Sequence, residues 1–224
     1  MTTLYLVRHG QASFAAANYD CLSELGHRQS AWLGEHFAAR GIVFARAVCG
    51  TLDRQRQTAR TLLDAMGSTM PVAEHPGWNE YSGDALYKAY HGEGWAKARA
   101  KGDVREFYRT LKVALQHWSE ERLAGPMPET WREFGDRGVA ALHAACDGLP
   151  ADACVLAASS GGAIARAVCT ILQAPAQAAI ELNLQFRNSG FCEIFVSPRS
   201  MRVVSFNCIP HLDRPDRAAS ITHS

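Results

Sequence analysis

The chain has 224 residues and almost balanced charge, with 23 lysine and arginine residues against 22 aspartate and glutamate residues. This balance argues against nucleic acid as a general partner, and no run of like charge indicates a tail that seeks one. The apolar runs are too short to cross a bilayer, and the amino terminus carries no basic leader. We therefore expect a cytoplasmic protein with no membrane partner, long enough to bury one sizeable core.

The seven cysteines are scattered, with no C-x-x-C pair and no clustering with histidine. An odd number of thiols in mostly apolar segments favours reduced, buried cysteines over a disulfide framework or a zinc site. We expect no metal site built from these residues.

A short apolar run at residues 4–7 is typical of a strand that is buried on both faces. The run ends at Arg8 and His9, and Gly10 follows, where the chain can turn. Open α/β sheets place their ligand sites at such strand ends. A neutral imidazole beside a permanent guanidinium indicates a nucleophile with an anionic substrate held against it. The triplet alone fits a polar cap on a strand end equally well, since short motifs often match by chance.

The next part of the chain predicts a helix, a strand and a second helix. Ser23 is a candidate N-cap for a helix to about Arg40, and residues 44–49 predict the strand. Arg54 falls in the first turn of the second helix. A helix N-terminus attracts anions through its free amides and its dipole, so a guanidinium there would strengthen an anion site. Position alone favours a solvated surface arginine.

Glu80 follows a predicted short third strand at residues 71–75. It lies between aromatic residues and before a glycine, where a carboxyl is expected to be partly desolvated. Desolvation would raise its pKa towards that of a useful general acid. An ordinary loop glutamate fits the same sequence.

From about residue 84 to residue 128 the pattern changes to a helix-rich insertion with many aromatic and charged side chains. We expect most of the aromatic residues to pack this insertion onto the main body and the charges to form a solvated face. The insertion would then act as a cap, with a few side chains lining the substrate entrance.

Residues 153–158 form an uninterrupted apolar stretch of strand type, followed by Ser-Ser-Gly-Gly at residues 159–162 and a helical segment. Strand, glycine-rich turn and helix N-terminus together leave backbone amides free to face a phosphate. Alone, the glycines also fit a tight turn with close helix packing. Residues 191–197 and 202–206 alternate like two strands of an antiparallel edge hairpin, and the polar tail after Leu212 is expected to be loose.

The order of strands and helices predicts an α/β fold, a three-layer sandwich with a mostly parallel sheet. No repeat, low-complexity tract or linker divides the chain, so we expect one domain over residues 1–224. In a parallel sheet the strand-to-loop junctions lie along one edge. Arg8, His9, Arg54 and the turn at residues 159–162 are therefore predicted to converge there.

Four sequence blocks occur in a fixed order along the chain. They are Leu-Val-Arg-His-Gly at residues 6–10, Leu-Ser-Glu-Leu-Gly-His-Arg-Gln at 22–29, Thr-Leu-Asp-Arg-Gln-Arg-Gln-Thr-Ala at 51–59, and Asn-Glu-Tyr at 79–81. Together they resemble the histidine phosphatase superfamily, which includes the cofactor-dependent phosphoglycerate mutases. The resemblance covers nearly the whole chain and implies a phosphoglycerate mutase-like fold.

One departure from the family pattern lies after the late strand. Where the family shows Ser-His-Gly-Gly, this chain has Ser-Ser-Gly-Gly, so the second histidine is replaced by Ser160. In the family that histidine helps to hold the phosphoryl oxygens, and Ser160 can supply at most a neutral hydroxyl. Loss of one such donor typically costs about 10²–10³ in rate, so we expect a slowed enzyme. Ala15 also stands where many members carry an asparagine for the phosphate.

The resemblance implies a metal-independent phosphatase that hydrolyses a phosphate monoester through a phosphohistidine, with no cofactor. Its partner would be a small phosphorylated substrate or inorganic phosphate. The implied site consists of the nucleophile His9, the arginine clamp Arg8 and Arg54, the acid Glu80, and a phosphate cradle completed by Ser160 and the amide of Gly161.

Two other functions stay open. A phosphoglycerate-type mutase would return the phosphoryl group from His9 to a second hydroxyl. We rank it lower because the family's mutases typically extend a basic C-terminal segment over the site, whereas the tail of this chain is short. A non-catalytic phosphate or phosphoprotein binder would have kept the pocket and lost turnover with the second histidine. The sequence also leaves the substrate and the oligomeric state open, a homodimer included.

Overall fold

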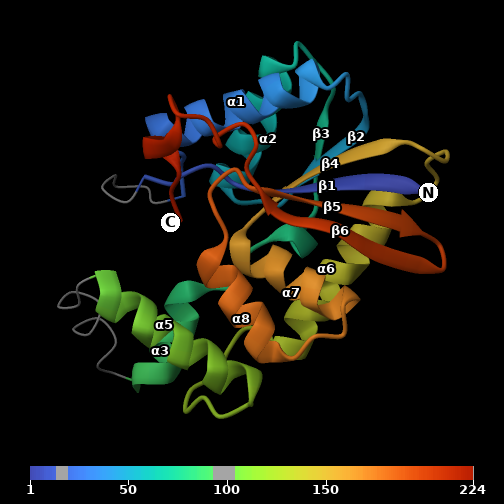
Figure 1. Cartoon of the computed structure of the whole chain (residues 1–224). Coiled ribbons are helices and arrows are strands. Elements are labelled where there is room, and N and C mark those ends of the chain that lie inside the picture. Colours follow the sequence, from blue (N-terminus) through green and yellow to red (C-terminus); the bar gives the residue numbers. More distant parts are fainter. Residues whose placement is uncertain (14–19, 93–103, 224) are drawn as a thin grey trace.

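The structure is a computed structural model that describes residues 1–13, 20–92 and 104–223 (Figure 1). Within these ranges one six-stranded sheet has the strand order β3-β2-β4-β1-β5-β6. Its strands are β1 (Thr2–Arg8), β2 (Phe44–Cys49), β3 (Val72–Glu74), β4 (Cys154–Ser159), β5 (Phe191–Ser197) and β6 (Ser200–Cys208). Strands β1 to β4 run parallel, whereas β5 pairs antiparallel with both β1 and β6. The sheet is therefore mostly parallel with an antiparallel hairpin at one edge, as predicted.

Helices cover both faces of the sheet and produce three layers (Figure 1). One face carries α1 (Glu24–Ala39) and α2 (Asp53–Ala65), and the other carries α6 (Trp131–Cys146), α7 (Gly161–Ile171) and α8 (Ala176–Gln185). Tyr5 and Val7 of β1 belong to the apolar cluster with α1 and α2, whereas Leu4 and Leu6 belong to the cluster with α6 and α7. Burial on both faces is what the uninterrupted apolar sequence of β1 predicts. The predicted α/β three-layer architecture is confirmed.

The helix ends follow local capping chemistry. Ser23 caps α1, and its side chain accepts a hydrogen bond from the amide of Gly26 at 3.0 Å. Arg40 is the C-cap, and Gly41 follows with a φ of 67°, so the predicted ends of this helix are confirmed. Helix α8 escapes sequence prediction because it buries only two residues and shows no clear apolar stripe. Among the described helices, none is long and apolar enough to cross a bilayer.

The insertion contributes α3 (Gly83–His91) and α5 (Val104–Ser119), which lie together at one end of the molecule (Figure 1). Trp118 of α5 is buried against Tyr81 and Phe134, with ring centroids 5.5 and 5.4 Å away. Helix α5 also contacts α8 and α6. Aromatic side chains thus attach the insertion to the main body, whereas residues 93–103 lie outside the described ranges.

The C-terminal tail packs on the main body, so the prediction that it would be loose is wrong. A 3₁₀ turn, Ala218–Ser220, lies near α1 (Figure 1). The buried Gln29 donates to the carbonyl of Ser220 at 2.7 Å and to the hydroxyl of Thr222 at 3.0 Å. The amide of Asn188 donates to the carbonyl of Thr222 at 2.9 Å. Polar groups of the main body thus hold the tail, because buried donors need acceptors.

The turn after β1 touches the start of α1 without space for a side chain. A Cβ on Gly10 would lie 2.3 Å from the carbonyl oxygen of Gly26, and one on Gly26 would lie 2.1 Å from that of Gln11. Backbone atoms on both sides cannot move aside as a side chain could. This close contact fixes the first sequence block against the second.

We expect Gly26→Ala to lower the free energy of unfolding by about 1–3 kcal/mol, because an added methyl group must push backbone apart. Urea unfolding measures this change. Gly83→Ala is the matched control, since a Cβ there meets nothing within 4 Å. Equal stability of the two variants would show that the loop and helix are not held in this contact.

Candidate active site

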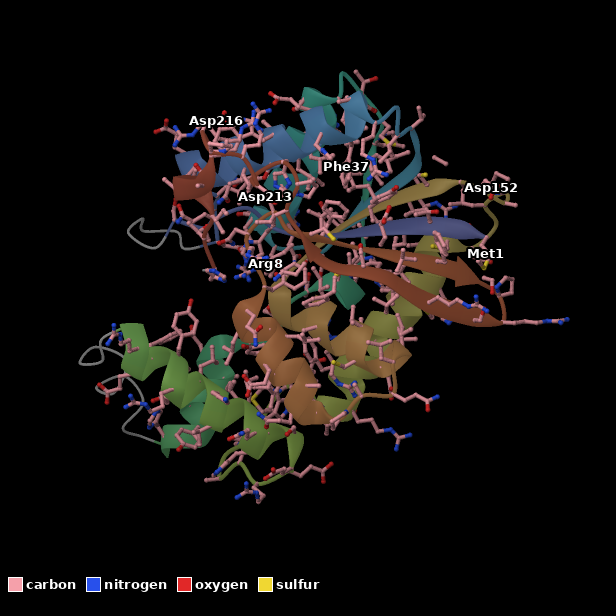
Figure 2. All side chains as sticks on the ribbon, in the orientation of Figure 1. Met1, Arg8, Phe37, Asp152, Asp213 and Asp216 are labelled. Carbon is pink, nitrogen blue, oxygen red and sulfur yellow. The ribbon has the colours of Figure 1, made fainter. Side chains whose placement is uncertain are left out.

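The carboxyl ends of three parallel strands bring the candidate residues to one edge of the sheet. Arg8, the last residue of β1, lies in register with Ser159, the last residue of β4. Beside them, Cys49 at the end of β2 pairs with Ala158. Figure 2 shows Arg8 at this edge, whereas Met1 and Asp152 lie at the opposite one. The parallel register thus places the Arg-His-Gly turn, the start of α2 and the start of α7 side by side.

His9 is 6% exposed, and the turn that carries it also orients its imidazole ring. Its Nδ1 lies 2.7 Å from the carbonyl oxygen of Gly10, which can only accept, so Nδ1 carries the proton and Nε2 keeps its lone pair. Burial, and then the positive charges of Arg54 and Arg8, hold the pKa of His9 well below its usual value. The imidazole is therefore neutral at physiological pH, the form that can act as a base or a nucleophile.

Arg54 is held by an aspartate that sequence reasoning missed. Asp20 forms an ion pair with Nη1 of Arg54, and its other oxygen accepts from the amide of Asp53 at 2.8 Å. Asp20 thus caps α2, whose N-cap residue Leu52 has no capping side chain. No local signal reveals this cap, since it lies more than 30 residues before the helix. The side chain of Arg54 is only 13% exposed, so it is not a solvated surface arginine.

Thr58 connects the third sequence block, residues 51–59, to the first, residues 6–10. Its hydroxyl donates to the carbonyl of Arg54 at 2.7 Å and accepts from the amide of Gly10 at 3.1 Å. One side chain therefore sets the distance between the Arg-His-Gly turn and the first turn of α2. This explains why the threonine of the block follows the arginine by four residues, since that spacing lets the hydroxyl of Thr58 reach the carbonyl of Arg54.

Arg8 extends from the end of β1 towards the C-terminal part of the chain. Its Nη1 donates to the carbonyls of Phe186 and of His223, the latter at 3.0 Å. The tail therefore reaches the edge where the candidate residues meet. Its arginines point elsewhere, since Arg214 pairs with Asp216 and Arg217 lies over the ring of Trp32.

Glu80 faces the N-terminus of α7 from the segment between the 3₁₀ turn Pro76–Trp78 and α3. Its Oε2 accepts from the amide of Gly162 at 2.9 Å. Burial raises the pKa of Glu80, against the opposing effects of this hydrogen bond and of Arg54 and Arg8. A carboxyl with a raised pKa close to two guanidinium groups is suited to giving up and taking back a proton.

Ser160 is fully buried, and its hydroxyl accepts from Gln55. Nε2 of Gln55 donates to Oγ of Ser160 at 2.8 Å and to the carbonyl of Trp78 at 3.0 Å. The side chain of Ser160 does not cap α7, although Ser160 is the N-cap residue. Sequence reasoning missed Gln55, yet there is a signal for it. It is a polar residue on the buried stripe of α2, three and four residues before Thr58 and Ala59.

The two glycines of the late turn allow side chains to approach the backbone. A Cβ on Gly162 would lie 2.4 Å from Oε1 of Glu80, and one on Gly161 would lie 3.3 Å from Nε of Arg8. Glycine at these positions lets an acid and a guanidinium reach the first turn of α7.

The structure also bears on the remaining candidate features. All seven cysteines are free thiols, but only four are buried as expected, Cys49, Cys146, Cys169 and Cys192, whereas Cys21, Cys154 and Cys208 are half-buried. In the described ranges no group of three His, Cys, Asp or Glu side chains could hold a metal ion. Ala15, noted for the missing asparagine, lies outside the described residues.

A sequence model of the histidine phosphatase superfamily (branch 1) matches residues 4–209. The chain belongs to this superfamily. A probable phosphoglycerate mutase GpmB from Yersinia pestis (strain Pestoides F) is 29% identical over 206 residues, which cover 87% of this chain and 85% of that protein. A 2,3-bisphosphoglycerate-dependent phosphoglycerate mutase from Bartonella quintana (strain Toulouse) is 33% identical over 142 residues, which cover 60% of this chain and 64% of the mutase.

A solved structure supports the fold of this superfamily member. A mutant phosphoserine phosphatase from Entamoeba histolytica, in complex with phosphoserine, matches with a TM-score of 0.67 and 16% sequence identity. The match covers 95% of this chain and 100% of that chain. The resemblance stated from the four sequence blocks and the phosphoglycerate mutase-like fold are both confirmed.

Proposed function

We propose that this histidine phosphatase superfamily member hydrolyses a phosphate monoester through a phosphohistidine on His9, without a metal or another cofactor. The observation that carries the proposal is the state of His9. It is buried and neutral, its Nδ1 is directed to Gly10, and the charges of Arg8 and Arg54 lie close to it. A nucleophile with a free lone pair and two cations near it suits attack on a phosphoryl group.

The reaction has two steps. Nε2 of His9 attacks phosphorus, and the bond to the ester oxygen breaks while Glu80 gives that oxygen its proton. Water then attacks phosphorus, Glu80 takes a proton from the water, and the bond to Nε2 breaks to release phosphate. Arg8 and Arg54 balance the charge on the equatorial oxygens, because guanidinium groups match phosphoryl oxygens in geometry. To do so they exchange their contacts with the tail carbonyl and with Asp20.

Ser160 and the amide of Gly161 complete the phosphate cradle in this proposal. Gln55 donates to Oγ of Ser160, which leaves the hydroxyl hydrogen free to be donated to a phosphoryl oxygen. A neutral hydroxyl stabilises developing charge less than an imidazolium does. We therefore expect turnover about 10²–10³ below that of a site with the second histidine.

The mutase and binder functions are the alternatives. Of the relatives named above, one is a phosphoglycerate mutase and the other a probable phosphoglycerate mutase, and the solved structure named above is a mutant phosphatase that holds phosphoserine. The tail favours hydrolysis, because its Arg214 and Arg217 contact acidic and aromatic side chains of this chain. A small phosphorylated molecule is the proposed partner of a phosphatase or a mutase, and phosphate or a phosphoprotein that of a binder.

We expect the protein to hydrolyse 4-nitrophenyl phosphate and to form an acid-labile phosphoryl group that a rapid quench with labelled substrate traps. His9→Ala should lose both signals. Saturable phosphate binding with neither signal would mean a binder. Conversion of 3-phosphoglycerate to 2-phosphoglycerate, faster than release of phosphate, would mean a mutase.

We expect Ser160→His alone to give no faster hydrolysis, because Gln55 already fills the space beside Oγ and an imidazole would be overpacked. Gln55→Ala together with Ser160→His should make room and raise kcat by about tenfold or more, since a charged donor replaces a hydroxyl. Gln55→Ala alone is the control. A double variant no faster than this control would place residue 160 outside the reaction path.

A further inference from the structure

We propose that Arg137 is a positioning residue that fixes the Glu80 segment for proton transfer, and that its ion pair with Glu129 connects this segment to the end of the insertion. The inference rests on the proposed function, in which Glu80 is the acid. Arg137 does not touch the reacting atoms. It acts through the backbone that carries Glu80.

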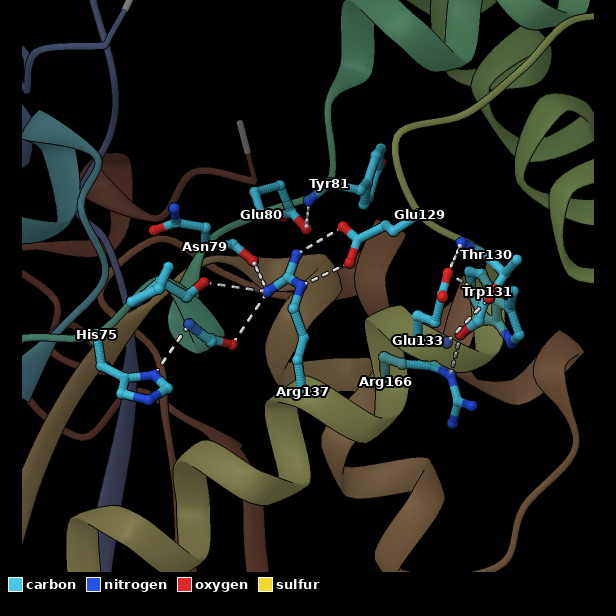
Figure 3. Close-up of polar contacts among 12 residues, drawn as sticks. His75, Asn79, Glu80, Tyr81, Glu129, Thr130, Trp131, Glu133, Arg137 and Arg166 are labelled. Carbon is cyan, nitrogen blue, oxygen red and sulfur yellow. Dashed lines mark hydrogen bonds and ion pairs between the residues drawn. The ribbon is translucent and has the colours of Figure 1, made fainter.

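Arg137 gathers the backbone carbonyls that precede Glu80 (Figure 3). From α6, its Nη1 donates to the carbonyl oxygens of Asn79 at 2.8 Å and Gly77 at 3.0 Å, with that of Pro76 at 3.4 Å. The carbonyl of Pro76 also accepts from the amide of Asn79 at 3.0 Å, whereas those of Gly77 and Asn79 lie at the end of the 3₁₀ turn and just after it, where no further turn follows to satisfy them. One cation thus stabilises the segment directly before the acid.

Glu129 holds the guanidinium in the orientation that this contact needs. Nε and Nη2 of Arg137 donate to the two carboxylate oxygens of Glu129 at 2.6 and 2.8 Å (Figure 3). The side chains are only 25% and 21% exposed, so solvent screens this pair less than a surface pair. These two hydrogen bonds to Glu129 fix the plane of the guanidinium. Nη1 is then directed at the carbonyl oxygens of Gly77 and Asn79. A lysine has no such fork and could not make both sets of contacts.

The residue after Glu80 is held from the same helix. Tyr81 packs edge-on against Phe134 of α6, with ring centroids 5.7 Å apart and an interplanar angle of 89°. The guanidinium of Arg137 lies over the ring of Phe134, 4.7 Å from its centroid. Helix α6 therefore fixes the chain on both sides of Glu80.

Glu129 also connects the acid segment to the insertion. It directly follows the predicted insertion, residues 84–128, and its carbonyl oxygen accepts from Nε1 of Trp118 in α5 at 3.1 Å. A continuous set of contacts thus runs from α5 through Glu129 and Arg137 to Asn79. Movement of the insertion would therefore displace the segment that carries Glu80. It would not displace His9 in the same way, because the imidazole is held by the carbonyl oxygen of Gly10 in its own turn.

A general acid matters most when the leaving group is a poor one. An alcohol leaves only if it gains a proton, whereas 4-nitrophenolate leaves without one, and a positioned acid typically contributes about 10²–10⁴ in rate. A displaced Glu80 should therefore slow the hydrolysis of alkyl esters selectively. Phosphate binding through Arg8 and Arg54 should stay the same, and so should KM.

The test compares Arg137→Met with the wild type on β-glycerophosphate and 4-nitrophenyl phosphate. We expect kcat for β-glycerophosphate to fall by about tenfold or more, with KM within about twofold and the rate on 4-nitrophenyl phosphate within about threefold. Glu80→Gln should show the same selectivity, more strongly. Arg132→Met is the matched control, because Arg132 lies on the same helix, is 88% exposed and, among the residues that the structure describes, forms an ion pair only with Asp136, at 3.6 Å.

A cavity of about 470 Å³ lies beside the pair and is lined in part by Arg137, Glu129 and Asn79. A methionine at position 137 therefore has space to adopt its own side-chain conformation. If Arg137→Met does not fold, Glu129→Gln is the variant that tests the inference. We expect its kcat for β-glycerophosphate to fall by about threefold or more, with the same selectivity for this ester over 4-nitrophenyl phosphate. Equal losses on both esters, a raised KM, or an unchanged β-glycerophosphate rate would overturn the inference alone. Failure of the wild type to hydrolyse either ester would instead overturn the proposed function, and this inference with it.

Discussion

The register between β1 and β4 is the constraint on which the site depends. Because Arg8 lies opposite Ser159, the turn after β1 and the first turn of α7 start at the same level. The pairing of β4 with β2 extends this level to the start of α2. A slip of one residue would turn each strand's side chains to the opposite face and separate the charged groups. Charged residues far apart in the sequence meet here because backbone hydrogen bonds align the strand ends.

The concentration of positive charge at this edge must be compensated, and the chain does so with its own groups. His9 stays neutral, because burial and two neighbouring guanidinium groups disfavour its protonation. Asp20 pairs with Arg54, and main-chain carbonyls accept from Arg8. An incoming phosphoryl group would take the place of such contacts. The proposed anion site can thus stay partly buried without leaving its cations uncompensated.

Sequence patterns predicted the parts of the fold that depend on local chemistry. The buried strand before Arg8, the cap at Ser23 and the hairpin at the sheet edge all follow from side chains near one another in the sequence. They also predicted that the strand ends would meet, since parallel strands share an edge. The resemblance of four short blocks supplied the family, which the match over residues 4–209 confirms.

Contacts between distant segments could not be predicted in the same way. Asp20 caps a helix from another part of the chain, and the tail after Leu212 is held by Gln29 of α1. In the sequence, Arg137 is one more charged residue on an amphipathic helix. Only the fold reveals that it binds the backbone carbonyls of Gly77 and Asn79. Each of these cases is a buried or half-buried polar group that finds its partner in three dimensions. Apolar periodicity carries no information about such partners.

The central claim is that Arg8, His9, Arg54 and Glu80 surround a single phosphoryl group. A crystal structure with orthovanadate, which adopts the five-coordinate geometry of phosphoryl transfer, tests it most directly. We expect vanadium within bonding distance of Nε2 of His9, equatorial oxygens on Arg8 and Arg54, and the carboxyl of Glu80 at the oxygen opposite His9. Vanadate bound elsewhere, or an imidazole of His9 turned away from it, would contradict the account.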